Sequence, residues 1–242
     1  MTRSLLEISA NSLASALAAQ AGGADRVELC ENLSEGGTTP SYGTLTVARD
    51  RLRIPLYVLI RPRAGDFLYD DSERAVMLAD IEVCVRLGCD GVVIGALDAD
   101  GEVDAALCRE LIDAAGSLGV TFHRAFDAAR DHSRALEAAI ELGCERILTS
   151  GGASDAWQGA DRIAALVEQA AGRIALMAGA GVTAQNIAEL AQRARVSELH
   201  ASAKAPRVSA MGYRNEALAG LSPDWIQSDE QRVRELASAL HA

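Results

Sequence analysis

Glutamate and histidine side chains recur near the ends of short apolar runs, where a strand would bury them. Glu7 lies in SLLEIS (4–9), Glu28 in DRVELC (25–30) and His200 in SELHASA (197–203). A carboxylate inside a strand is costly unless it is paired, hydrogen-bonded or hydrated, so each needs a partner close by. Glutamate and histidine also commonly act in general acid–base catalysis. The candidate catalytic residues, all at or just past such run ends, are Glu7, Glu28, Cys30, Arg61, Arg63, His123, Arg124, Asp127, His200 and Ser202.

A structural explanation competes with the catalytic one. Glu7 or Glu28 could form an inward ion pair with Arg61 that only fills the interior of the fold, and for one glutamate alone the two explanations weigh about equally. For the whole set we favour a site, because structural polar residues have no reason to gather at one end of a fold.

Two glycine-containing turns are candidate anion sites. MAGAGVTAQNIAEL (177–190) predicts a strand, a turn through Gly179 and Gly181, and a helix whose first N–H groups favour an anion. Ser150 and Gly151, in SGGAS (150–154), would add donors from a neighbouring strand. The alternative is that these glycines only turn the chain.

The cysteines bear on metal binding. They form no CxxC or zinc-ribbon pattern, and Cys84, Cys89, Cys108 and Cys144 follow apolar helical patterns that predict burial. Cys30 instead ends a strand run. With His123 and His200 it could bind copper, because thiolates select Cu(I) and imidazole accepts copper. A site with one thiol and two imidazoles that holds no metal fits the sequence at least as well.

The elements that position these residues are alternating strands and helices. Eight apolar runs follow glycine or proline turns, and alanine- and leucine-rich helical stretches separate them. This alternation over 242 residues predicts one (β/α)₈ TIM-like barrel as a single domain, 1–242. The alternative is a doubly wound sheet, which normally has a glycine-rich loop after its first strand, and this sequence has no glycine there. We expect residues 205–223 to be irregular and to pack over one end of the barrel, and 229–240 to form a closing helix. The eight strand runs are 4–9, 25–30, 55–62, 89–95, 119–126, 144–150, 172–179 and 197–203.

Composition excludes several classes of protein. The net charge of −11 makes non-specific binding of nucleic acid or of an anionic membrane surface unfavourable. No apolar stretch is long enough to span a membrane, and the N-terminus predicts a strand and a helix rather than a secretory signal. Lys204 is the only lysine among 23 basic residues, so any Schiff-base chemistry would have to use it.

Several motifs resemble one family over nearly the whole chain. AGGADRVELCENLSEGGTTPSYG (21–43), IRPRAGDFLYDD (60–71), VTFHRAFD (120–127), ILTSGG (147–152), MAGAGV (177–182) and MGYRN (211–215) are together similar to the CutC family of copper homeostasis proteins. The resemblance implies a cytoplasmic, oligomeric TIM-like barrel associated with copper tolerance and copper binding. It marks Ser150 and the ten candidate catalytic residues as motif positions. Relatives often carry cysteine where this chain has Ser9 and Leu68, which leaves Cys30 as the only thiol at the site.

Three functions therefore stay open. One is a CutC-like protein that binds Cu(I) weakly and influences copper handling. The second is an enzyme acting on a small anionic, for example phosphorylated, metabolite, with His123 or a glutamate as general acid–base and Arg61 and Arg63 holding the anion. The third is a non-catalytic binding module. For each of them we expect a homodimer or higher homo-oligomer.

Overall fold

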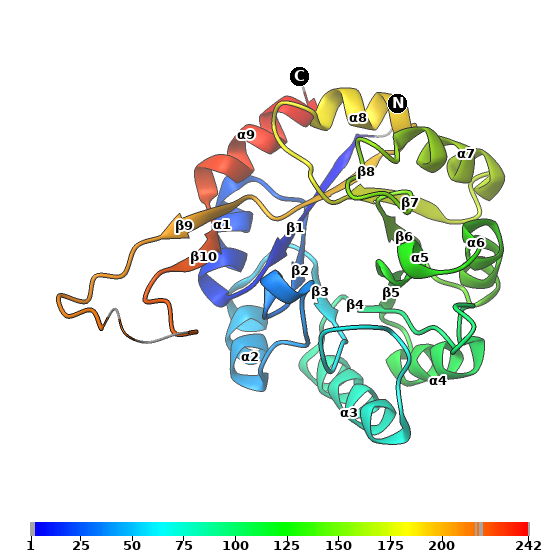
Figure 1. The fold of residues 1–242 in the computed structure, drawn as a ribbon, viewed down its shortest axis with the longest axis horizontal. Coiled ribbons are helices and arrows are strands. Elements are labelled where there is room, and N and C mark those ends of the chain that lie inside the picture. Colours follow the sequence, from blue (N-terminus) through cyan, green and yellow to red (C-terminus); the bar gives the residue numbers. More distant parts are fainter. Residues whose placement is uncertain (1–2, 216, 218–219, 242) are drawn as a thin grey trace.

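A computed structural model describes residues 3–215, 217 and 220–241. Eight strands pair in parallel, each with the next along the chain, and β1 closes the ring on β8 (Figure 1). The predicted (β/α)₈ barrel is confirmed. The strands are β1 (Leu5–Ala10), β2 (Arg26–Leu29), β3 (Leu56–Leu59), β4 (Gly91–Ile94), β5 (Gly119–Phe122), β6 (Arg146–Thr149), β7 (Ala175–Gly179) and β8 (Glu198–Ala201).

Helices surround the barrel, and local sequence signals place their ends. The helix after β1 begins at Ser12, whose hydroxyl accepts the N–H of Ser15, and the helix after β3 begins with a capping box between Asp70 and Glu73. The helices are α1 (Leu13–Gly22), α2 (Tyr42–Arg51), α3 (Asp71–Leu87), α4 (Ala105–Ala115), α5 (Ala125–Ala128), α6 (His132–Glu141), α7 (Ala160–Ala170), α8 (Ile187–Ala194) and α9 (Glu230–His241), with a 3₁₀ turn η1 (Leu33–Glu35).

Apolar side chains fill the layer between barrel and helices. Leu6 and Ile8 of β1 and Val27 and Leu29 of β2 are fully buried and belong to one core cluster with residues of the surrounding helices. Alternate residues of the same strands point into the barrel. Several of these inward residues are charged, which is unusual because branched apolar side chains normally fill such interiors. These charged side chains lie inside the barrel, next to the cavity at its carboxyl end.

The segment after β8 differs from the sequence prediction. β9 (Lys204–Arg207) pairs antiparallel with β10 (Trp225–Ser228), and the described residues between them, 208–215, 217 and 220–224, extend away from the barrel as an arm (Figure 1). Residues 216, 218 and 219 of the predicted segment lie outside the described residues. The expected packing of residues 205–223 over one barrel end is therefore wrong. Its apolar side chains are largely exposed, for example Val208 at 73% and Tyr213 at 75%. α9 then returns to the barrel, where Gly22 of α1 leaves room for Val233.

None of the helices in the described part of the chain is long and apolar enough to cross a membrane.

Candidate functional site

A cavity of about 1130 Å³ opens at the carboxyl ends of the barrel strands. Strand residues such as Glu28 and His200 form its floor, and the loops after the strands form its wall. This is the end of the barrel at which such folds place their active sites. The predicted site residues that line it are Glu28, Arg61, His123, Arg124, Asp127, Gly181, His200 and Ser202.

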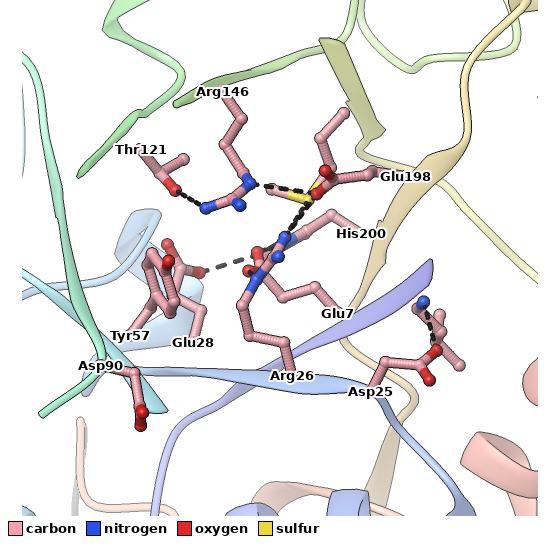
Figure 2. Close-up of polar contacts among 12 residues, drawn as sticks. Glu7, Asp25, Arg26, Glu28, Tyr57, Asp90, Thr121, Arg146, Glu198 and His200 are labelled. Carbon is pink, nitrogen blue, oxygen red and sulfur yellow. Dashed lines mark hydrogen bonds and ion pairs between the residues drawn. The ribbon is translucent and has the colours of Figure 1, made fainter. Parts of the chain in front are cut away.

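On the cavity floor, His200 lies between two carboxylates. Its Nδ1 is 2.7 Å from Glu7 Oε1, and its Nε2 is 3.7 Å from Glu28 Oε2 (Figure 2). The register of the sheet produces this contact, because Glu7 pairs with His200 across β1 and β8. All three side chains are buried. Of the two carboxylates only Glu28 lines the cavity. Glu7 contacts the imidazole on the side away from the cavity.

The pKa values of the two glutamates are shifted in opposite directions. Burial by itself would raise the pKa of Glu7, but Arg26 and His200 lower it to about 2. Burial raises the pKa of Glu28 above its usual value, and the charge of Glu7 adds to the effect. The pKa of His200 is raised, because the carboxylates of Glu7 and Glu28 outweigh its burial. The floor therefore combines a carboxylate whose pKa is lowered, a carboxyl group whose pKa is raised and, between them, an imidazole whose pKa is raised.

Below the floor, a buried ion network continues along the barrel axis. Arg26 pairs with Glu7 through Nε and with Glu198 through Nη2, the latter at 2.7 Å (Figure 2). Arg146 donates from Nε to the same Glu198 oxygen at 3.0 Å. The ring of Tyr57 lies beside both guanidinium groups.

The alternative in which Glu7 or Glu28 forms an ion pair with Arg61 is not found: Glu7 pairs with Arg26, and Glu28 faces His200. Arg26 and Arg146 are not among the candidates from the sequence, because they stand at the first positions of β2 and β6 and not at the strand ends. The signal was present in the sequence. Arg26 stands two residues before Glu28, and Arg146 two before Leu148, so the period-two rule places both on the inner face.

On the cavity wall, backbone carbonyls fix Arg61. Its Nη1 donates to Gly37 O at 2.6 Å and to Glu35 O at 2.9 Å, and its Nη2 donates to Gly65 O at 2.8 Å. Its Nε is buried and has no hydrogen-bond partner among the described residues. Arg61 therefore lies at the wall with its Nε–H unused.

His123 also has a buried ring nitrogen without a hydrogen-bond partner in any residue that the structure describes. Its Nδ1 accepts the N–H of Ala125 at 3.1 Å, so Nε2 carries the ring proton. Nε2 is buried without a hydrogen-bond partner in the part of the chain that the structure describes. Burial and the nearby charge of Arg61 lower the pKa of His123 to about 3, so the ring is neutral at pH 7.

The carboxylate of Asp127 accepts hydrogen bonds from the loop after β6, which the sequence predicts as an anion site. It accepts the N–H of Ser150 at 3.0 Å, the N–H of Gly152 at 2.9 Å and the hydroxyl of Thr149 at 2.6 Å. The N–H of Gly151 bonds to Thr149. The predicted anion site at Ser150 and Gly151 is therefore filled by a carboxylate of the chain itself.

Other candidates are also placed differently from expectation. Arg124 lines the cavity but pairs with Asp127 at 2.7 Å. Arg63 pairs with Asp66 at 2.9 Å and with Glu73, and is not part of the cavity lining. Gly179 lies in β7 beside His200, while Gly181 does line the cavity.

The residues present do not fit the predicted copper site. No three His, Cys, Asp or Glu side chains within the described ranges are grouped so that they could hold a metal ion. Cys30 is buried in a cluster with Tyr57, Leu59 and Val93, and burial raises its pKa to about 12, far from a thiolate. His123 uses the lone pair of Nδ1 for a backbone N–H and carries a proton on Nε2. The expected convergence of Cys30, His123 and His200 on a metal is therefore not found.

Comparisons with known proteins agree on one family. Residues 4–205 match the model of the CutC family. A family protein CutC from Xanthomonas axonopodis pv. citri (strain 306) is 58% identical over 97% of this chain and 98% of its own, and one from Chromobacterium violaceum is 58% identical over 98% of both chains. A crystal structure of a protein from Streptococcus agalactiae, named as a copper homeostasis protein CutC, superposes with a TM-score of 0.78 at 37% identity and covers 81% of this chain and 97% of that one. Thiamine phosphate pyrophosphorylase from Pyrococcus furiosus, at 16% identity and a TM-score of 0.62 over 98% of this chain and 95% of that one, shares the fold alone.

Proposed function

The chain belongs to the CutC family, and on that premise we propose that its barrel mouth is the active site of an enzyme that performs acid–base chemistry on a small anionic ligand. The observation that carries the proposal is the position of His200 between Glu7 and Glu28 on the floor of the cavity.

Glu28 is the general base and acid in this proposal. It reaches the cavity, and burial raises its pKa above the usual value, which makes its carboxylate a stronger proton acceptor. His200 faces Glu28 and is held by Glu7, whose charge is fixed by Arg26. Transfer of a proton among Glu7, His200 and Glu28 leaves the summed charge of these three side chains unchanged.

The charges at the cavity wall favour an anion. Arg61, Lys204 and Arg232 line the cavity, and none of them forms an ion pair with another described residue. Arginine keeps its charge at every physiological pH. An anionic ligand would supply the missing counter-charge, and Gly181 would add backbone contact at the same wall. Arg63 is not part of this proposal, because its charge is already paired with Asp66 and Glu73.

Copper is the alternative that the relatives' name suggests. Its most specific ligand would be the thiolate of Cys30, with imidazole support from His123 and His200. The burial of Cys30, its hydrogen-bond distance of 3.6 Å to the hydroxyl of Ser9 and the proton on His123 all disfavour Cu(I) at this place. We therefore expect an anion to be the primary ligand.

Thermal unfolding in the presence of ligand candidates tests the proposal. The panel holds inorganic phosphate, sugar phosphates, dicarboxylates and Cu(I). A ligand present at 100 times its dissociation constant stabilises the folded state by about 2.7 kcal/mol. We expect a shift with an anion, its loss in Arg61→Gln and its retention in the control Arg63→Gln, which lies outside the cavity. No shift with any anion, beside a clear shift with Cu(I) that Cys30→Ser removes, would reverse the ranking.

The Glu28→Gln variant separates an enzyme from a binding module. We expect this variant to bind the anion found above and to lose its conversion, because the amide keeps the shape of the side chain but cannot take a proton. Equal conversion by Glu28→Gln would reject Glu28 as the acid–base group. Binding without conversion in the wild-type protein would favour the binding module.

A further inference from the structure

We infer that the ligand carries a carbonyl group whose oxygen binds between Arg61 Nε–H and His123 Nε2–H, and that Glu28 removes a proton from the carbon next to it. This inference rests on the proposed function and names the substrate class and the reaction class of the same site.

The two donors are unused, buried and part of one cavity wall. Arg61 is 5% exposed and His123 is 4% exposed, and both line the cavity. Leaving a buried N–H without a partner costs on the order of 1–3 kcal/mol, and a ligand acceptor would relieve that cost at both groups. The hydroxyl of Tyr69, the third buried polar atom without a partner among the described residues, lies near Arg61 but does not line the cavity.

Phe67 brings the two donors to one place. Its ring centroid lies 5.1 Å from that of His123, and the guanidinium carbon of Arg61 lies 5.2 Å from the same ring. Phe67 also lines the cavity. The imidazole and the guanidinium therefore both pack near one aromatic ring that lines the cavity.

The orientation of each donor is fixed before a ligand arrives. Three carbonyl oxygens hold the guanidinium of Arg61 through Nη1 and Nη2, so the position of Nε is fixed as well. The ring of His123 lies over Gly95 of the neighbouring strand segment, where a Cβ would meet its Cε1 and Nδ1 at 2.6 Å. Preorganised donors of this kind stabilise negative charge that develops during a reaction.

The chemistry of the donors favours a carbonyl oxygen over a phosphate or a metal ion. His123 is neutral at pH 7, so it donates a hydrogen bond without contributing a charge. A neutral imidazole and one guanidinium match an oxygen that is uncharged in the substrate and becomes negative in the reaction. A metal ion is excluded from this position, because both groups present N–H donors.

Proton transfer at this site balances without a further reactant. The carboxylate of Glu28 takes the proton from the carbon, and the C–H electron pair forms a C=C bond. The electron pair of the C=O bond moves to the oxygen, which Arg61 and His123 then stabilise. Return of the proton to the same carbon regenerates the carbonyl compound. Where that carbon carries a hydroxyl group, the hydroxyl proton moves to the enolate oxygen, the new C=O bond forms at that carbon, and Glu28 returns its proton to the former carbonyl carbon, which yields an isomer. The anionic end of the substrate lies towards Lys204 and Arg232, which line the cavity and form no ion pair with another residue that the structure describes.

Binding of enolate mimics tests the inference. The probes are phosphoglycolohydroxamate against glycerol 3-phosphate, which keeps the phosphate but lacks the carbonyl oxygen, and oxalate against lactate. We expect the wild-type protein to bind at least one mimic tenfold or more tightly than its control. His123→Gln and Arg61→Lys should reduce that ratio to about one, and Arg63→Gln should leave it unchanged. Equal binding within both pairs, or a preference that survives in both variants, overturns the inference.

Exchange with deuterium gives a second readout that does not depend on one mimic. Dihydroxyacetone phosphate and pyruvate are incubated with the protein in D₂O, and loss of the C–H signal next to the carbonyl is followed by proton NMR. We expect exchange with at least one of them, slowed at least 100-fold in Glu28→Gln and in His123→Gln. Thermal unfolding of each variant checks that it is folded. No exchange with either compound speaks against the inference.

The two proposals can fail separately. Glycerol 3-phosphate tests anion binding alone, and we expect Lys204→Gln to weaken it. If this binding persists while the enolate mimics show no preference, only the inference about the carbonyl group fails. If no anion binds at all, the proposed function fails as well.

Discussion

Replacing Arg26 by methionine should destabilise the protein strongly and in a way that depends on pH. Arg26 is the cation that pairs with Glu7, and the Glu7 side chain is 1% exposed. Although burial raises the pKa of Glu7, Arg26 and His200 lower it from 4.5 to about 2. At about 1.4 kcal/mol per pKa unit, that shift corresponds to about 3 kcal/mol of stability at pH 7. Breaking a buried pair by removing one partner generally costs a similar 3–5 kcal/mol.

The sign of the pH dependence follows from the direction of the shift. Because the folded-state pKa of Glu7 is lowered, its contribution is present above the unfolded value near 4.5 and is lost as the pH falls towards 2. In Arg26→Met the carboxylate loses its main cation, so its pKa rises and protonation relieves the buried charge. The loss of stability should therefore be about 3 kcal/mol at pH 7 and about 2 kcal/mol at pH 3.5, because pH 3.5 lies below the unfolded-state pKa and still above the folded-state one.

Urea unfolding at pH 7 and pH 3.5 measures this difference. The control is Arg193→Met, which breaks an exposed pair with Asp161 and should change stability little at either pH. The double variant Glu7→Gln with Arg26→Met should recover part of the loss, because it removes the unpaired charge. A loss below 1 kcal/mol at pH 7, or an equal loss at both pH values, would refute the reasoning.

Three further outcomes are expected. Gly95→Ala should lower stability by about 1–3 kcal/mol in thermal unfolding, because its Cβ meets the His123 ring at 2.6 Å, and an unchanged unfolding temperature would contradict this placement of the ring. Asp127→Ala should cost roughly 1–3 kcal/mol in urea at pH 7, since the N–H groups of Ser150 and Gly152 lose their acceptor. The pKa of Asp127 is lowered despite burial, so this loss should fade as the pH falls below about 4, and a constant loss would argue against it. Light scattering at micromolar concentration should give the mass of a homodimer, and a monomer mass would reject that expectation.

The barrel was predictable because its signals repeat along the chain. Each strand run follows a turn, and the helices between them close with glycines such as Gly88, which has the positive φ of a helix C-cap. Residues at the strand ends that keep the strand's alternation, such as Glu28 and His200, could therefore be placed at the cavity.

The rest of the site depends on contacts that sequence alone does not reveal. Arg63 stands two residues after Arg61, but the chain has already left the strand, and local carboxylates pair with it. Asp127 captures the donors of a loop 23 residues later in the chain. Cys30 follows the same strand alternation as Glu28 but does not line the cavity. The Gly37 backbone packs against it, since a Cβ at Gly37 would lie 3.5 Å from the Cys30 Cβ.

Three large rings inside the barrel each lie over a glycine of a neighbouring strand position. His123 covers Gly95, His200 lies beside Gly179 with its Cβ 3.2 Å from the place a glycine Cβ would take, and Tyr57 covers Gly91. Each ring and its glycine form a unit, because a side chain at the glycine would displace the ring. In evolution the two positions of a pair should therefore change together, so that a relative with a larger residue at the place of Gly95 should also lack histidine at the place of His123.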